Sequence, residues 1–188
     1  MSDKELQNLV LIVEAASREE LKQEPVSYSA AGLSPVISSA AFKQHYDVLY
    51  RGYVDRFNKG QGDSTFNRAG ADLHRIYFTT LRAPKMNNIP RGASESLINR
   101  KFGSFEKFRE EFTEAALKLQ GSGWVYLSRS GEIKTITNHQ SRPDIALLLD
   151  MWEHAYNQDY AADKQRYIKN FWRIVDWDRV NIRIYAGK

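Results

Sequence analysis

Apolar and aromatic residues recur at helical spacing through the first part of the chain. The pattern predicts a helix over about 39–58 and a second over about 66–82, because side chains three or four positions apart share one helix face. A short polar stretch with two glycines, 59–63, separates them, which favours an antiparallel helical hairpin. The residues that define the two apolar stripes are Phe42, Tyr46, Leu49, Tyr50, Tyr53, Val54 and Phe57, then Leu73, Tyr77 and Leu81.

The spacing changes in the second half of the chain. Ser104 is a favourable N-cap for a helix that runs towards Gly121. The β-rich runs 124–128 and 133–137 flank a Ser-Gly turn and predict a hairpin, and 145–149 predicts a third strand. Helical periodicity returns over about 163–183.

The order of these elements predicts an α+β fold. We expect an N-terminal antiparallel α-hairpin domain over 25–88 and a C-terminal α/β lobe over 89–188, which contains a three-stranded antiparallel sheet. The Pro-containing stretch 84–90 is the expected linker. Residues 1–24 are predicted to add an N-terminal helix, either a solvated helix that packs on the hairpin or an element that contacts a partner.

Composition limits the possible classes of protein. A chain of 188 residues, 42% of them hydrophobic, is long enough to bury a core. Cysteine is absent, which excludes disulfides, thiolate metal sites and cysteine catalysis. The net charge of +4 comes from interspersed charges, so we expect attraction of anions but no binding of nucleic acid. No apolar run approaches the roughly 20 residues of a membrane span, and we expect a cytoplasmic protein without membrane contact.

Histidines and one carboxylate supply the candidate chemistry. Asp150 ends a predicted strand and His154 follows four residues later, while His45 and His74 lie on the two helices of the hairpin. Three imidazoles and one carboxylate would suit iron or manganese. Each histidine also fits an ordinary buried residue of an amphipathic helix, and an Asp-x-x-x-His spacing arises by chance. Spacing alone therefore leaves a metal site and an ordinary core as alternatives.

The run Asp-Met-Trp-Glu-His-Ala-Tyr that starts at Asp150 resembles the Asp-x-Trp-Glu-His-Ala-Tyr signature of the iron/manganese superoxide dismutases. Further segments are similar in the same order: Leu-Ser-Pro-Val-Ile-Ser from Leu33, Phe-Gly-Ser-Phe from Phe102, Gly-Ser-Gly-Trp from Gly121 and Asn-Phe-Trp-Arg-Ile-Val-Asp-Trp from Asn170. The resemblance covers about 26–183.

The resemblance implies a role for particular residues. It implies one Fe or Mn ion per chain, Tyr53 as the tyrosine beside the substrate entrance, and Glu153 in the interface of a homodimer. Phe78 stands at a position that another aromatic residue usually occupies. The implied metal ligands are His45, His74, Asp150 and His154, and the implied aromatic walls are Trp124 and Trp152.

The activity implied by the resemblance is that of an antioxidant oxidoreductase. Enzymes of this family oxidise one superoxide to dioxygen and reduce the next to hydrogen peroxide. The alternative is a superoxide-dismutase-like structural or assembly protein that retains the fold without the activity, because a fold does not guarantee its chemistry.

Several positions depart from the family pattern. A histidine and a tyrosine that usually pair near the mouth of the site are replaced by Leu49 and Asn157. The glutamine that contacts metal-bound solvent is replaced by Gly70 at one of its two usual positions. At the other position the register favours His139, and a slip of one residue would select Gln140 instead. His139 could also simply cap the end of a strand.

Overall fold

The structure is a computed structural model that describes residues 2, 4, 5, 7 and 20–186. Most of the helix predicted within 1–24 therefore lies outside the described residues. Residues 20–26 form no helix or strand. They are held against the hairpin by a reciprocal pair of hydrogen bonds, in which the Leu21 amide donates to Asn58 Oδ1 and Asn58 Nδ2 donates to the Leu21 carbonyl.

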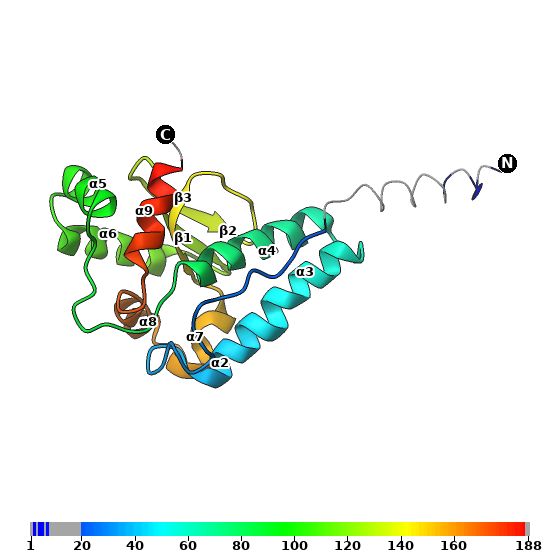
Figure 1. Cartoon of the computed structure of the whole chain (residues 1–188), viewed down its shortest axis with the longest axis horizontal. Helices are drawn as coiled ribbons and strands as arrows, with labels where there is room; N and C mark the ends of the chain where they lie inside the picture. Colours follow the sequence, from blue (N-terminus) through cyan, green and yellow to red (C-terminus); the bar gives the residue numbers. More distant parts are fainter. Residues whose placement is uncertain (1, 3, 6, 8–19, 187–188) are drawn as a thin grey trace.

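The helical hairpin begins with three helical segments that run without interruption, α2 (Ser39–Lys43), the π-helical segment η1 (Gln44–Tyr50) and α3 (Arg51–Asn58). Helix α4 (Ser64–Thr79) returns beside them, as Figure 1 shows. The Asp63 side chain caps α4 by accepting a hydrogen bond from the Phe66 amide. The π-helical segment is a local departure from the regular helix that the spacing predicts.

The sheet contains β1 (Gly123–Ser128), β2 (Ile133–Thr137) and β3 (Ile145–Asp150). The strand order is β2-β1-β3 and both pairings are antiparallel. Trp124 and Asp150 are directly paired across β1 and β3. The central strand β1 and the edge strand β3 are buried throughout. The predicted α+β class with a three-stranded antiparallel sheet is confirmed.

Two helices lie between α4 and the sheet in the sequence, α5 (Ala93–Phe102) and α6 (Phe105–Lys118). The Ser104 side chain accepts a hydrogen bond from the Lys107 amide, as expected for the N-cap of α6. The periodicity did not predict α5, which starts after Gly92 without a side-chain cap.

Three helices follow the sheet, α7 (Glu153–Tyr160), α8 (Lys164–Phe171) and α9 (Trp177–Tyr185). The helical region predicted over about 163–183 consists of two helices, because the chain leaves the helix between α8 and α9. In that break Val175 forms a β-bridge with Leu81, so tertiary hydrogen bonds replace helical ones.

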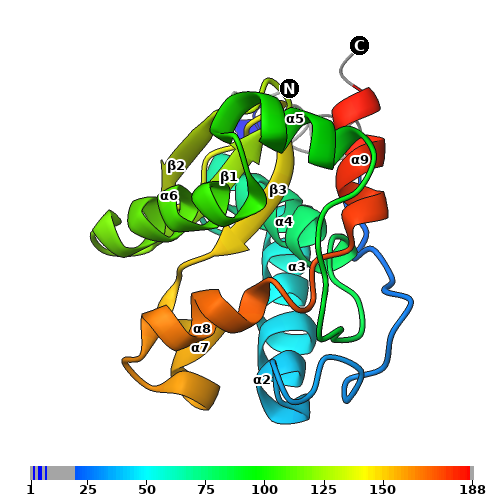
Figure 2. The ribbon, with the colours of Figure 1, turned by 90° about the vertical axis from the view of Figure 1, so that its left-hand side faces the viewer.

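Helices surround the sheet, as Figure 2 shows. Helix α6 contacts β1 and β2, whereas α4 and α9 contact β3. This packing brings α4 next to the end of β3, where Asp150 lies. Within the part of the chain that is described, no helix combines the length and the apolar character needed to cross a bilayer.

Candidate metal centre

Four elements bring the predicted ligands together. His45 lies on η1, His74 on α4, Asp150 at the end of β3 and His154 in the first turn of α7. Each can offer one ligand atom such that all of these atoms lie within 4.8 Å of one another. His45, His74 and Asp150 are buried, and the side chain of His154 is 19% exposed. Residues far apart in the sequence thus form one compact donor cluster.

Asp150 Oδ2 is the centre of this cluster. It lies 3.2 Å from His45 Nε2, 3.3 Å from His154 Nε2 and 3.9 Å from His74 Nε2. The other carboxylate oxygen, Oδ1, accepts a hydrogen bond of 2.8 Å from the Trp152 amide. That bond orients the carboxylate, so that one oxygen is held by the backbone and the other points at the imidazoles.

Hydrogen bonding selects the tautomer of His74. Its Nδ1 lies 2.6 Å from the Gly70 carbonyl, which can only accept, so Nδ1 carries the proton and Nε2 keeps its lone pair. The Nε2 atoms of His45 and His74 are buried and have no hydrogen-bond partner among the described residues. The 3.2 Å approach of His45 Nε2 to Asp150 lacks the angles of a hydrogen bond.

The electrostatics favour a metal-binding protonation state at His45, His74 and Asp150. Burial lowers the pKa of both His45 and His74 and favours their neutral forms. Burial alone would raise the pKa of Asp150, but the neighbouring His154 and His45 side chains outweigh that effect and lower the pKa. An ionised carboxylate beside neutral imidazoles is the form in which these side chains bind a cation.

These observations fit a transition-metal ion. Buried nitrogen atoms without a partner cost free energy unless a ligand satisfies them. Three imidazoles and one carboxylate match the preference of iron and manganese for mixed nitrogen and oxygen donors. His45, His74, Asp150 and His154 would hold such an ion.

His139 lies next to the cluster and Gln140 does not. His139 is buried and its ring stacks on Trp152 at 4.5 Å between centroids. Trp124 Nε1 donates to His139 Nδ1 over 3.2 Å, which leaves the proton on Nε2, a buried atom without a partner among the described residues. Burial lowers the pKa of His139 to about 4, so the ring is neutral at pH 7. Gln140 is exposed and accepts a hydrogen bond from Arg142.

Gly70 provides the space that His139 occupies. A Cβ atom at this position would lie 2.8 Å from Tyr53 Cδ1 and 3.1 Å from His139 Cδ2. The two positions that the sequence offered for a solvent-contacting side chain are therefore neighbours in space. The side chain at 139 fills the region that the glycine leaves open.

Tyr53 forms another wall of the site. Its ring lies 5.2 Å from that of His74 and 4.8 Å from that of His139. The guanidinium of Arg56 lies over the Tyr53 ring, 4.7 Å from its centroid. Burial raises the pKa of Tyr53, and the positive charge of Arg56 partly offsets that effect.

The rim of the site carries the departures from the family pattern. Leu49 is half-buried, whereas Asn157 and Glu153 are exposed. Val48, beside Leu49, is 55% exposed. Trp152 is half-buried and stacks on His154 as well as on His139, so it connects the rim to the ligand cluster.

Two tyrosines support the cluster without a clear signal in the sequence. Tyr167 donates a hydrogen bond of 3.0 Å to the carbonyl of Asp150, and its hydroxyl lies 3.2 Å from that of Tyr77. Tyr77 also stacks on His45 at 5.5 Å. Helical spacing predicted that Tyr77 points inward, but it does not reveal a contact with α8.

The fold and the cluster define a class, an α+β protein with a candidate metal centre of three histidines and one aspartate. Residues 90–183 match the family described as iron/manganese superoxide dismutases, C-terminal domain. The chain belongs to the iron/manganese superoxide dismutase family.

Similar proteins from several organisms carry different metal designations. A superoxide dismutase [Fe] of Pyrobaculum aerophilum is 33% identical, over 85% of this chain and 90% of that protein. A superoxide dismutase [Mn/Fe] of Porphyromonas gingivalis is 36% identical, over 83% of this chain and 95% of that protein. Superoxide dismutase [Mn] 3 of Leptolyngbya boryana is 30% identical, over 87% of this chain and 82% of that protein.

Proposed function

We propose that this chain dismutates superoxide at a single Fe or Mn ion held by His45, His74, Asp150 and His154. The convergence of three imidazole nitrogens on one carboxylate oxygen carries the proposal, together with two buried Nε2 atoms that have no partner in the described chain. Membership of an oxidoreductase family that uses Fe or Mn supports it. Similarity to proteins of all three metal designations leaves both metals as candidates for this chain.

The bound ion would supply one-electron chemistry, oxidising one superoxide to dioxygen and reducing the next to hydrogen peroxide. The protein residues have separate tasks. Asp150 offsets positive charge in the buried site, and the Trp152 amide and Tyr167 hydroxyl hold the end of β3 in place. Formation of hydrogen peroxide consumes protons, so the site needs donors close to the substrate.

His139 and Tyr53 are the proposed proton-handling residues. Trp124 holds His139 with its Nε2 proton free to donate to an oxygen atom in the site. Tyr53 keeps its phenol proton at neutral pH, and burial raises its pKa further above the ordinary value for tyrosine. Trp124 contributes in two ways. Its hydrogen bond fixes the tautomer of His139, and its ring packs against that of His74 at 5.1 Å between centroids.

We further propose a homodimer whose interface includes Glu153. Glu153 is exposed at the start of α7, directly before the ligand His154. Val48, on η1 three residues after His45, is an exposed apolar side chain. An acidic side chain at this place could contact a basic or imidazole group of a second copy.

The decisive experiment measures metal and activity together. The purified chain should contain about one Fe or Mn per molecule and should dismutate superoxide. His74→Ala should lose both, because it removes a donor that no neighbour can replace. His154→Gln, at a more exposed position, should behave in the same way if the first variant folds poorly. Metal content and dismutation rate are measured for each variant, and circular dichroism shows whether the variant is folded.

Thr65→Ala, at an exposed position of the same helix α4, is the matched control and should retain metal and activity. A folded wild-type protein without Fe or Mn would contradict the proposal and favour the structural alternative. Retention of activity in folded His74→Ala would also remove this cluster as the site.

A further inference from the structure

Arg56 lies over the ring of Tyr53, the tyrosine that forms one wall of the metal centre. The two residues are one helical turn apart on α3, and the guanidinium carbon of Arg56 is 4.7 Å from the centre of the Tyr53 ring. A cation at this distance is attracted to the face of an aromatic ring. Arg56 is exposed whereas Tyr53 is buried, so the contact joins the surface of α3 to the wall of the site.

A buried asparagine holds the guanidinium of Arg56 in place. Arg56 Nε donates a hydrogen bond of 3.1 Å to Asn67 Oδ1, and Asn67 Nδ2 donates one of 2.8 Å to the carbonyl of Gln61. Asn67 is buried on α4, and Gln61 lies in the turn between α3 and α4. Because both ends of the amide are engaged, Asn67 fixes the position of Arg56 relative to the tip of the hairpin.

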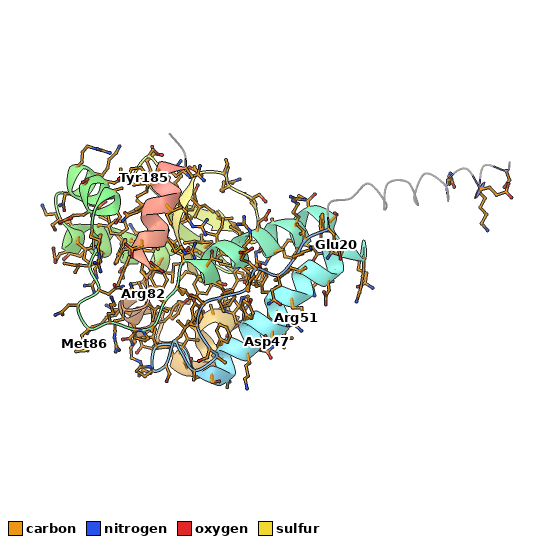
Figure 3. All side chains as sticks on the ribbon, viewed as in Figure 1. Glu20, Asp47, Arg51, Arg82, Met86 and Tyr185 are labelled. Atoms are coloured by element: carbon orange, nitrogen blue, oxygen red, sulfur yellow. The ribbon has the colours of Figure 1, made fainter. Side chains whose placement is uncertain are left out.

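The charge of Arg56 is not offset by a carboxylate. Its hydrogen-bond partner Asn67 is neutral, and Arg56 forms no ion pair within the part of the chain that the structure describes. Arg51 on the same helix differs, because it lies 3.9 Å from the carboxylate of Asp47. Arg51 and Asp47 are both labelled in Figure 3. A carboxylate beside Arg56 would weaken the attraction between its charge and the Tyr53 ring, and none is paired with it.

The hydroxyl of Tyr53 does not fix the orientation of its ring. It makes no hydrogen bond to any other described residue. Other tyrosines differ, since the Tyr46 hydroxyl donates to the carbonyl of Glu24 and the Tyr160 hydroxyl donates to that of Val36. The orientation of the Tyr53 ring therefore depends on the side chains that pack around it.

Three rings and one guanidinium surround Tyr53. The ring centroids of His139, His74 and Phe66 lie 4.8, 5.2 and 6.1 Å from that of Tyr53. Arg56 is the fourth neighbour. Among these four side chains Arg56 alone is exposed, so it is the contact that a substitution can remove without changing the core.

We propose that Arg56 is a positioning residue for dismutation, which holds the Tyr53 ring so that the Tyr53 hydroxyl can donate a proton to an oxygen atom of the substrate. The hydroxyl then regains its proton from water. Position matters because a general acid must lie within hydrogen-bond reach of the atom that it protonates. Asn67 contributes by holding Arg56. The proposal rests on the proposed function, in which Tyr53 handles protons.

The experiment is a double-mutant cycle on the metal-loaded protein. Arg56→Met should lower kcat about twofold to fivefold with little change in KM, the range that corresponds to an exposed cation–π contact. The same substitution in a Tyr53→Phe background should cause no further loss, because that ring has no proton to donate. Arg56→Lys should recover part of the rate, since an ammonium group also binds the ring face. Equal losses in both backgrounds would overturn the proposal.

Crystal structures of the variants supply a readout that does not depend on activity. In Arg56→Met and in Asn67→Ala the Tyr53 ring should be displaced, or its B-factors should rise relative to those of His74. An unmoved and equally ordered ring would overturn the proposal. Arg51→Met, at an exposed position of the same helix, is the matched control and should change neither the ring nor kcat.

The two readouts also separate this proposal from the proposed function. An inactive wild type would refute the proposed function and, with it, any role of Arg56 in dismutation. A displaced ring in Arg56→Met would still show that Arg56 holds Tyr53. An active wild type whose kcat and Tyr53 ring are unchanged in Arg56→Met would refute the positioning role alone.

Discussion

Gly70 shows how one residue without a side chain determines the composition of the site. The glycine lies on α4 one turn before His74, and its carbonyl accepts a hydrogen bond from His74 Nδ1. The space beside it is filled by Tyr53 and His139. A glycine in the middle of a helix usually costs stability, so its presence here has a packing reason.

Gly70→Ala should therefore disturb the site even though alanine favours the helix. The added Cβ meets two ring systems that are already packed, so one ring must move. We expect a loss of roughly 0–2 kcal/mol in the free energy of unfolding, since strain of about 1–3 kcal/mol is partly offset by about 1 kcal/mol of helix propensity. We also expect a fall in dismutation rate and a changed pH profile. Urea unfolding and activity assays measure both.

Gly52→Ala is the matched control because it is also a helical glycine, on α3. Its Cβ would meet only the flexible end of Arg56, at 3.0 Å. This variant should be neutral or slightly stabilising. If Gly70→Ala behaves in the same way, the packing role assigned to Gly70 is wrong.

The sequence identifies the candidate metal ligands better than it identifies the residues whose hydrogen bonds orient those ligands. His45, His74, Asp150 and His154 were predicted from residue type, spacing and resemblance, and the structure places them together. The bonds that orient them depend on contacts between distant segments, such as that from Tyr167 to the Asp150 carbonyl. Such contacts follow from the packing of whole helices, which periodicity along one segment does not specify.

At the scale of elements, helix α4 carries His74 and begins at a well-formed N-cap. Asp63→Ala should cost about 1 kcal/mol in the free energy of unfolding, because it removes the acceptor for the Phe66 amide and a negative charge near the helix N-terminus. Metal content should stay unchanged, since the cap is several turns from His74. Urea unfolding of the metal-loaded protein tests this.

Asp55→Ala serves as the comparison for the cap. Asp55 is exposed on α3 and its substitution should change stability by less than about 0.5 kcal/mol. Equal losses in the two variants would mean that the cap contributes nothing specific to α4.

Helix α5 and the break between α8 and α9 were not predicted from the sequence, and each omission has a physical reason. Helix α5 follows Gly92, whose φ of 66° lies in the left-handed region, and buries only Ser94, Leu97 and Ile98. Its apolar stripe is thus too short to give a clear periodic signal. The break between α8 and α9 is stabilised by Asn88 Nδ2, which donates to the carbonyls of Trp172 and Val175. A distant side chain overrides a local helical pattern there.

At the scale of the whole molecule, the ligand cluster joins the two halves of the chain. His45 and His74 come from the hairpin, whereas Asp150 and His154 come from β3 and α7. The division at 84–90 stays a prediction, but a metal bound by both halves would hold them together irrespective of where a boundary lies. Metal binding should therefore contribute to folding stability as well as to chemistry.

In the proposed homodimer, the rim of the metal centre that carries Glu153 would contact a second copy of the chain. In a twofold dimer each interaction occurs twice, so a change at Glu153 alters two symmetric sites at once. Glu153→Gln should weaken the homodimer by about 2–5 kcal/mol for each buried charge pair that it breaks, which corresponds to roughly a thirtyfold to several-thousandfold rise in Kd. Analytical ultracentrifugation over a range of concentrations measures this, because the variant should dissociate at concentrations where the wild type remains paired.

Glu110→Gln, an exposed position on α6, provides the control of equal charge change. It should leave the dimer intact because α6 lies against β1 and β2 rather than at the rim of the metal centre.

The rim itself differs from the family pattern, since Leu49 and Asn157 remove a polar pair and leave an apolar group beside the exposed Val48. An apolar interface of this kind would strengthen at higher salt, whereas the charge pair of Glu153 would weaken. If Kd is unchanged in Glu153→Gln, the copies associate through another surface, and the salt dependence then indicates whether that surface is apolar or charged.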